Sequence, residues 1–235
     1  MRWIGVMLAS VALTWTTLAR ADAASDFSEV RRGALPVRFA FLGFGPDGTA
    51  YVRSITCGET GATYCLVQLL AADPSGVVHT TTLLDVHDFY CGDGYEPAQC
   101  EPLLHERASF LGRERHALAA LPTLTSAAPL PDAARACGSL ADGPTSLRVR
   151  GGPRDAHEHD VVLEIVRANG AARTLLTLSR AETASGRIAA AYLTPDAASV
   201  VLVVTMSSRG GEWSDVTQQI VRIDLAHARA IADAP

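Results

Sequence analysis

The densest group of side chains that could do chemistry lies in one polar and aromatic segment of this chain. It contains Asp85, His87, Asp88 and Asp93. Exported proteins bind Ca²⁺ through oxygen ligands in such loops, although an EF-hand would need acidic residues at alternate positions closed by a glutamate. The alternative is a surface loop pinned by a disulfide. Because function tends to lie on loops held by a rigid scaffold, this loop is the first candidate site, with a divalent metal as its possible ligand.

A second candidate metal site is formed by His157 and His159. On a strand, residues two apart share a face, so the two imidazoles could take two positions around a metal ion. The third ligand would have to come from elsewhere in the chain. The alternative is a solvated polar loop that leads into a hairpin.

The chain has five cysteines, namely Cys57, Cys65, Cys91, Cys100 and Cys137. In an oxidising compartment, closely spaced cysteines most simply form disulfides. We expect Cys57 to pair with Cys65 across a hairpin loop and Cys91 to pair with Cys100, which leaves Cys137 free, but other connectivities stay open. Zinc binding is disfavoured because neither pair has the C-x₂-C spacing.

Two further patterns bear on catalysis. The run Gly43-Phe44-Gly45-Pro46-Asp47-Gly48 matches the dinucleotide motif G-x-G-x-x-G, but that motif needs a helix immediately after it. Strand-forming residues follow here, so we interpret the run as a turn. No G-x-S-x-G nucleophile motif occurs. The free thiol Cys137 is a candidate nucleophile only with a nearby base and a positive setting, and the alternative is a buried or merely unpaired cysteine.

Charge and hydropathy indicate where the protein works. The net charge of the 235 residues is −5, which gives no electrostatic case for binding nucleic acid or an anionic membrane. Residues 1–23 predict a cleaved signal peptide: Met1-Arg2 is followed by an apolar run of about 16 residues and by small-x-small cleavage signals. No later segment is long and apolar enough to span a bilayer. We therefore expect a periplasmic or secreted protein.

Turn and strand patterns dominate residues 24–235, which we expect to form a single domain. Residues 37–86 predict four strands, with turns at Pro46-Asp47-Gly48 and Asp73-Pro74-Ser75-Gly76. The spacing of Leu104, Ala108, Leu111 and Leu118 predicts one amphipathic helix over about residues 99–121. The helix belongs to a connection of about residues 97–135 that ends in a Pro/Ala-rich segment.

Strands resume at about residue 147. Asn169-Gly170 predicts a hairpin between residues 160–167 and 172–178, and further strands are expected at 188–193, 200–206 and 216–223. Pro46-Asp47 recurs 149 residues later as Pro195-Asp196, and Asp73 would match Asp224 if the second hairpin is two residues longer.

This repeat is similar to β-propeller blades, such as those of the bacterial periplasmic Tol-system propeller. A blade takes roughly 40–45 residues, and only two are visible with a helix between them. The predicted fold is therefore mainly β, with two blade-like antiparallel meanders packed as a sandwich or a partial propeller.

The order of features also resembles a family of bacterial predicted secreted proteins of unassigned function. Its pattern is a Gly-aromatic-Ser-x-Asp-Gly strand-turn-strand, a helix, and a Ser-Pro-Asp-Gly segment before a long apolar strand. The matching residues are Gly43, Phe44, Gly45, Asp47, Gly48, Thr194, Pro195 and Asp196. Gly45 stands where serine is usual and Ala197 where glycine is usual. The resemblance implies a related fold and brings no catalytic residues with it.

Three hypotheses of function follow, the last of which is a purely structural envelope protein. The first is an exported binding or scaffold module that presents loops to an envelope protein or glycan. The second is an envelope enzyme that uses a metal at His157 and His159 or the thiol of Cys137.

Overall fold

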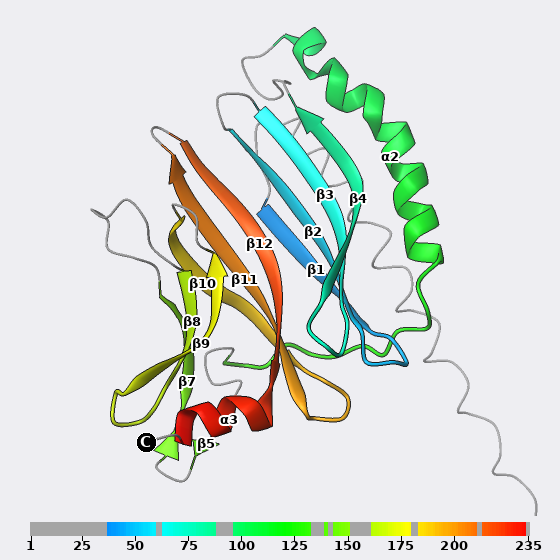
Figure 1. The fold of residues 1–235 in the computed structure, drawn as a ribbon. Helices are drawn as coiled ribbons and strands as arrows, with labels where there is room; N and C mark the ends of the chain where they lie inside the picture. Colours follow the sequence, from blue (N-terminus) through cyan, green and yellow to red (C-terminus); the bar gives the residue numbers. More distant parts are fainter. Residues whose placement is uncertain are drawn as a thin grey trace, which may run out of the picture.

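The first sheet is an antiparallel meander near the start of the chain (Figure 1). The structure is a computed structural model that describes residues 37–59, 63–87, 96–132, 139–140, 143–150, 161–179, 183–210 and 213–233. The predicted signal peptide lies outside these residues. The strands of the first sheet are β1 (Val37–Phe44), β2 (Ala50–Glu59), β3 (Thr63–Ala72) and β4 (Val78–His87). They confirm the four strands expected from the turn residues.

The second sheet contains β10 (Thr183–Leu193), β11 (Ser199–Gly210) and β12 (Trp213–Asp224), also as an antiparallel meander. Its middle strand, β11, is buried on both faces. Val201 and Val203 pack toward the first sheet, whereas Val200, Leu202 and Val204 pack in the opposite direction. A strand covered on both faces needs a continuous apolar run, and this explains the sequence from Val200 to Val204.

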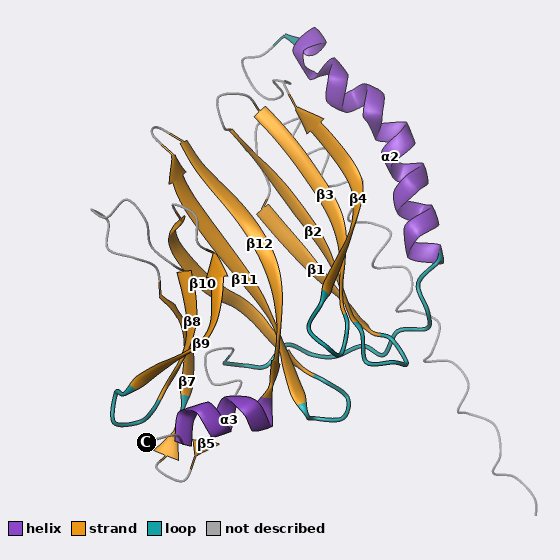
Figure 2. Ribbon diagram, viewed as in Figure 1, coloured by secondary structure: helices purple, strands orange, loops and turns teal. Residues whose placement is uncertain are grey.

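A third sheet covers the outer face of the second one (Figure 2). Its strands are β7 (Ser146–Arg150), β8 (Val161–Val166) and β9 (Ala172–Ser179), and a small pair, β5 (Ser139–Leu140) and β6 (Gly143–Pro144), precedes it. Helix α3 (Leu225–Asp233) packs against the same core. The mainly β class and the antiparallel meanders are confirmed. The strand from about residue 147 and the Asn169-Gly170 hairpin are also confirmed, as β7 and as the pair β8–β9. Their assembly into a separate third sheet, and helix α3, were not predicted from the sequence.

Helix α2 (Glu101–Ala119), preceded by the short 3₁₀ helix η2 (Pro97–Cys100), covers the free face of the first sheet. It confirms the predicted helix. The predicted buried face is slightly rotated, however: Leu103 and Phe110 are fully buried, while Leu104 and Leu111 are only partly buried. Leu103 and Phe110 are seven residues apart, or about two helical turns, so they form one line of contact with the sheet.

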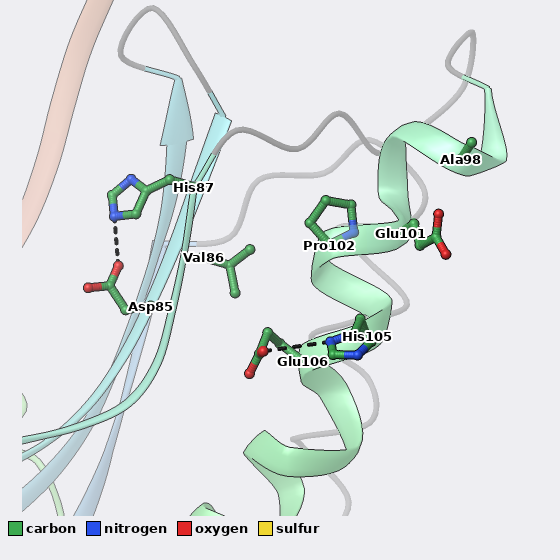
Figure 3. Close-up of a pocket in the computed structure, with 8 residues that line it drawn as sticks. All are labelled: Asp85, Val86, His87, Ala98, Glu101, Pro102, His105 and Glu106. Atoms are coloured by element: carbon green, nitrogen blue, oxygen red, sulfur yellow. Dashed lines mark ion pairs between the residues drawn. The ribbon is translucent and has the colours of Figure 1, made fainter.

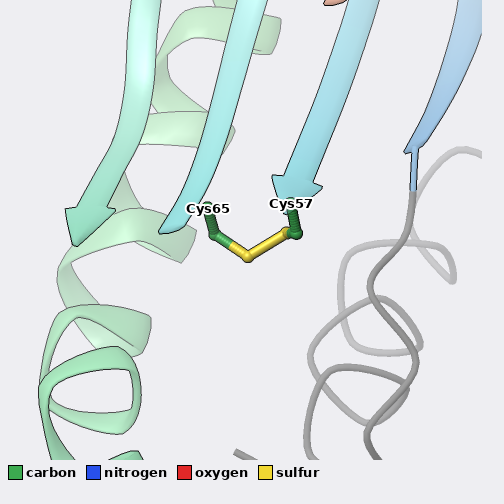
Figure 4. The surroundings of a disulfide bond; sticks show 2 residues. All are labelled: Cys57 and Cys65. Atoms are coloured by element: carbon green, nitrogen blue, oxygen red, sulfur yellow. A yellow bond between two sulfur atoms is a disulfide. The ribbon is translucent and has the colours of Figure 1, made fainter. Parts of the chain in front are cut away.

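Two further contacts fix the region beneath α2. Arg53 of β2 donates from Nε to a carboxylate oxygen of Glu114, and both side chains are 8% exposed. The Cys57–Cys65 disulfide joins directly opposed residues of β2 and β3 in the same core cluster (Figure 4). This pairing confirms the expected bridge. Cys100, at the start of the helical segment, is also disulfide-bonded; its predicted partner Cys91 lies outside the described residues.

The segment after α2, residues 121–132, is a strap that crosses the edges of two sheets. Phe44 and Thr125 exchange two backbone hydrogen bonds of 2.9 and 2.7 Å, and the Leu130 N–H donates to the Ala191 carbonyl at 2.8 Å. A Cβ on Gly43 would lie 2.7 Å from the Thr125 carbonyl oxygen, so only glycine allows this close approach. The Pro/Ala-rich segment is thus a strap that covers edges of β1 and β10.

The internal repeat is confirmed at its first turn but shifts at its end. Ala50 pairs with Ala72, 22 residues later, whereas Ser199 pairs with Asp224, 25 residues later. The second hairpin is therefore three residues longer, and the equivalence of Asp73 with Asp224 is wrong: Asp224 takes the place of Ala72.

The repeat also shows how the first two sheets face each other. Val52 and Val201 are equivalent positions, and both lie in the core cluster between these sheets. The two meanders therefore bury equivalent faces against each other, as the two halves of a sandwich do. Successive propeller blades, being related by rotation about one axis, would instead bury opposite faces.

Four turns share one backbone geometry, in which the fourth residue has a positive φ. Gly48, Gly76 and Gly170 have φ of 81°, 87° and 84°, and Ala197 has φ of 55°. A non-glycine residue in this region costs roughly 1–2 kcal/mol. At the fourth of these turns the sequence has alanine, although the backbone there also needs a positive φ.

Ala197→Gly is therefore expected to raise the free energy of unfolding. The gain should be about 0.5–1 kcal/mol, since relief of the left-handed strain exceeds the entropy that glycine adds to the unfolded chain. Urea unfolding monitored by circular dichroism measures it. Gly48→Ala, at the equivalent position, should lower stability by a similar amount. A loss of stability in Ala197→Gly would contradict this account.

Candidate functional site

An open cleft of about 630 Å³ lies between β4 and the start of α2 (Figure 3). We call it the β4–α2 cleft. Its size is in the range of ligand-binding sites. Its lining residues come from the end of β4 and from η2 and α2: Asp85, Val86, His87, Ala98, Glu101, Pro102, His105 and Glu106.

Polar side chains lie on both walls but point in different directions: Asp85 and His87 turn away from α2, whereas Glu106 turns toward β4 (Figure 3). On β4, the His87 Nε2 and Asp85 Oδ1 atoms are 2.7 Å apart, and the His87 ring lies over Tyr64 with a centroid distance of 6.0 Å. On α2, the His105 Nδ1 and Glu106 Oε1 atoms are 3.7 Å apart. The two pairs are therefore separate, and the group that the helical wall turns toward β4 is the Glu106 carboxylate.

A backbone carbonyl group of β4 also accepts a hydrogen bond next to the cleft. Arg113 of α2 donates from Nε to the Leu83 carbonyl oxygen at 2.7 Å, and its Nη2 lies 3.4 Å from Glu106 Oε2. A guanidinium of the protein itself thus bridges the strand and a carboxylate of the cleft.

Buried packing holds the two walls in place. Val86 is 6% exposed and belongs to the same core cluster as Leu103 and Phe110. The Arg53–Glu114 pair fixes the helix two turns beyond Glu106. The exposed polar residues of the cleft therefore stand on a rigid base, as a binding site requires.

Only part of the predicted site chemistry lies in the described residues. Asp85 and His87 are in the cleft. Six predicted residues lie outside the description: Asp88, Cys91, Asp93, Cys137, His157 and His159. Sequence reasoning missed Glu101, His105 and Glu106. No sequence pattern marked them as one site: Glu101 and His105 are four residues apart and share a side of the helix, whereas Glu106 lies on another side, toward β4 (Figure 3).

The described residues contain no group of three or more His, Cys, Asp and Glu that could hold a metal ion. The metal hypotheses for the loop and for His157 and His159 stay predictions, because their remaining residues are not described. Among the helices of the described part of the chain, none is long and apolar enough to cross a membrane.

A second polar centre lies on the third sheet. Glu164 of β8 is buried, and its two oxygens accept hydrogen bonds of 2.7 Å from Arg148 Nε and Arg150 Nε of β7. Burial alone would raise the pKa of Glu164, but the two guanidinium groups outweigh it, so this pKa is lowered. Because both arginines come from the neighbouring strand, this centre is a cross-strand ion pair.

A third polar centre joins the two repeated turns. Arg222 of β12 donates to the Gly48 carbonyl at 2.7 Å, and its charge acts on both Asp47 and Asp196. The pKa of Asp47 is lowered chiefly by the Thr49 N–H, and that of Asp196 chiefly by the Thr194 hydroxyl. The aspartates are thus turn-forming residues bonded to their own loops, which agrees with the interpretation of the Gly43–Gly48 run as a turn.

Two other ionisable groups are shifted for structural reasons. The pKa of Asp73 is lowered chiefly by the Ser75 hydroxyl in the turn between β3 and β4. Burial raises the pKa of Tyr192, whose ring stacks on Phe41 with centroids 3.8 Å apart. Both belong to the scaffold and neither lines the cleft.

Comparisons of this chain with protein-family models, with curated proteins and with solved structures gave no match. The resemblance to the secreted family stays a prediction, and the site must be argued from its own geometry.

Proposed function

We propose that this chain is an exported binding module and that the β4–α2 cleft is its contact site for an envelope protein or glycan. The observation that carries the proposal is an open cleft of about 630 Å³ between β4 and α2, on whose helical wall the Glu106 carboxylate turns toward the strand (Figure 3). Sites for small ligands and peptide segments combine such a concave shape with a few convergent polar groups.

Three observations support export. The Cys57–Cys65 disulfide is typical of an oxidising compartment. Residues 1–23 carry the pattern of a cleaved signal peptide. The resemblance to predicted secreted proteins points the same way. Together they favour the periplasm or the extracellular medium as the location of the protein.

The alternative of an envelope enzyme rests on His157 and His159 or on Cys137. All three lie outside the described residues, so the cleft is the better-supported site.

The test is a thermal-shift screen of the purified protein with muropeptides and with cationic and acidic peptides. A ligand at 100 times its Kd stabilises the folded state by about 2.7 kcal/mol, so a cleft ligand should raise Tm. The double variant Glu101→Gln/Glu106→Gln should lose this rise. Asp233→Asn, which removes the same type of charge from an exposed end of α3, should keep it. An equal rise in all three proteins, or no rise with any ligand, would overturn the proposal.

A further inference from the structure

We propose that this chain associates with a second copy of itself through the first half of β4, by antiparallel strand pairing about a two-fold axis. The inference goes beyond the proposed function, because the residues concerned, 77–82, do not line the β4–α2 cleft. Three features of the described residues carry it: exposure of this half-strand, a sequence that favours strand pairing, and the charge and symmetry of such a pair.

Residues 78–82 are exposed on both faces of β4. Side chains of a strand alternate between its faces, yet all five of these residues are exposed, and Val77 before them is 53% exposed. β4 is also the last strand of its sheet, and among the described strands only β3 pairs with it (Figure 1). The outer edge of this half of β4 is therefore open to another strand.

The layers on the two faces of the first sheet explain this exposure. α2 packs on the second half of β4, where Leu84 and Val86 are buried in the core cluster beneath the helix. On the opposite face, the second sheet packs mainly on β1 and β2, and Tyr192 of β10 stacks on Phe41 of β1. Neither layer covers residues 78–82.

Residues 77–82 lack the features that usually protect an edge strand from pairing, namely charged side chains, proline and bulges. The segment consists of two valines, three threonines and His79, and valine and threonine favour strands. The bulge of β4 comes after the segment, at Leu83, which is skipped in the register with β3. By contrast, the strap covers edges of β1 and β10. The first half of β4 is therefore suited to strand pairing.

Charge favours a second copy as the occupant of this edge. The chain has a net charge of −5, so acidic surfaces of two copies repel each other. Residues 77–82 contain no acidic side chain, and two copies can meet there without that repulsion. A strongly charged partner, in contrast, would find no carboxylate or guanidinium in this segment to bind.

Two-fold symmetry also determines how the two strands align. In a symmetric dimer the same segment contributes to both sides of the interface, and opposed residues of an antiparallel pair lie on the same face. The alignment that uses all of residues 78–82 is centred on Thr80, which faces Thr80 of the second copy, while Val78 faces Thr82. Thr–Thr pairs across antiparallel strands are favourable. The pairing joins the first sheets of the two copies into one continuous sheet.

The small contact predicts a weak dimer. A single pair of short strands buries less surface than a stable interface, which needs about 1,200 Å² or more in total. We therefore expect a dissociation constant between about 1 μM and 1 mM. Sedimentation of the purified protein over this range of concentration should show a reversible equilibrium between monomer and dimer.

Thr80→Lys assigns the dimer to this edge. It should weaken the dimer about tenfold or more, because two like charges then face each other at the centre of the pair. Thr174→Lys makes the same change at an exposed position of β9, the edge strand of the third sheet, and should leave the dimer unchanged. Circular dichroism checks that both variants are folded. A native protein that stays monomeric up to about 1 mM, or a dimer that Thr80→Lys does not weaken, overturns the inference.

Thr80→Cys tests the alignment of the two strands. Opposed residues of an antiparallel pair have Cβ atoms about 4.5–5.5 Å apart, which is close to the Cβ separation in a disulfide. Mild oxidation of this variant should therefore give a covalent dimer linked through position 80, identified by mass spectrometry of its proteolytic fragments. Thr174→Cys should give none. Absence of the link through position 80 in a protein that dimerises overturns the alignment centred on Thr80.

Discussion

Replacement of Glu114 by leucine is expected to lower the free energy of unfolding by about 3–5 kcal/mol, the usual cost of breaking a buried ion pair from one side. Glu114 accepts a hydrogen bond from Arg53 Nε, and both side chains are 8% exposed. The variant leaves the guanidinium buried without this carboxylate. Denaturation in urea, followed by circular dichroism, measures the change.

The double variant Arg53→Met/Glu114→Leu separates charge from packing. Replacing a whole buried ion pair by apolar groups is often neutral or stabilising, so this protein should recover most of the loss. Glu101→Gln, on the exposed side of the same helix, should change stability by less than about 0.5 kcal/mol. If the double variant is as unstable as Glu114→Leu, the loss arises from packing and the ion-pair account is wrong.

The Arg53–Glu114 pair should also affect ligand binding at the proposed site. Arg53 and Glu114 join the second strand of the first sheet to α2, which forms one wall of the cleft. At a temperature where Glu114→Leu is still folded, its helix should be less firmly held against the sheet. Binding of a cleft ligand should weaken in this variant and return in the double variant.

Local chemistry predicted much of this fold. The turn at Pro46-Asp47-Gly48 follows from residues that favour its dihedral angles, and the Cys57–Cys65 bridge follows from a short hairpin. The apolar run of β11 predicted a strand. Each of these features depends on residues that are close in the sequence, which is why a sequence pattern can contain them.

The arrangement of the sheets could not be predicted in the same way. The run Val200 to Val204 faces the first sheet with alternate residues and the third sheet with the others. The sequence indicates that both faces of β11 are buried, but it does not identify the sheets that cover them. Arg53 and Glu114 are 61 residues apart, and nothing local relates them. Pairings of this kind are set by the packed fold.

The sequence predicted only part of the candidate site. Asp85 and His87 stood out because polar and aromatic residues cluster there, and they line the cleft. Glu101, His105 and Glu106 looked like the solvated side of an amphipathic helix, which they also are. They line the cleft only because α2 lies against β4 on the face of the first sheet, and that placement depends on Leu103 and Phe110 packing against the sheet.

The second large effect concerns the buried carboxylate of the third sheet. Arg148→Ala/Arg150→Ala is expected to lower the free energy of unfolding at pH 7 by about 1.5–3 kcal/mol, because the Glu164 carboxylate loses the hydrogen bonds of both charged partners. Glu164 is 5% exposed, and each arginine donates to one of its oxygens at 2.7 Å. Chemical denaturation measures the loss.

The lowered pKa of Glu164 determines how this loss of stability should change with pH. In the native protein the pKa of Glu164 is lowered: burial would raise it, but the hydrogen bonds and charges of the two arginines prevail. A carboxyl group with a lowered folded-state pKa stabilises the fold above its unfolded pKa, and this contribution is lost as the pH falls through the folded-state pKa. The stability due to Glu164 should therefore be complete at neutral pH and should disappear in acid.

The arginine variant should behave differently. Without the guanidinium groups, the pKa of Glu164 should return toward its unfolded value. The variant then lacks the stabilisation at neutral pH, and acid has none to remove. The stability gap between the native protein and the variant should narrow on acidification from pH 7 toward pH 4. When Glu164→Gln is present in both proteins, the gap between them should not change with pH, since no titrating group is left there. A gap of constant size across this range would show that the arginines act through packing alone.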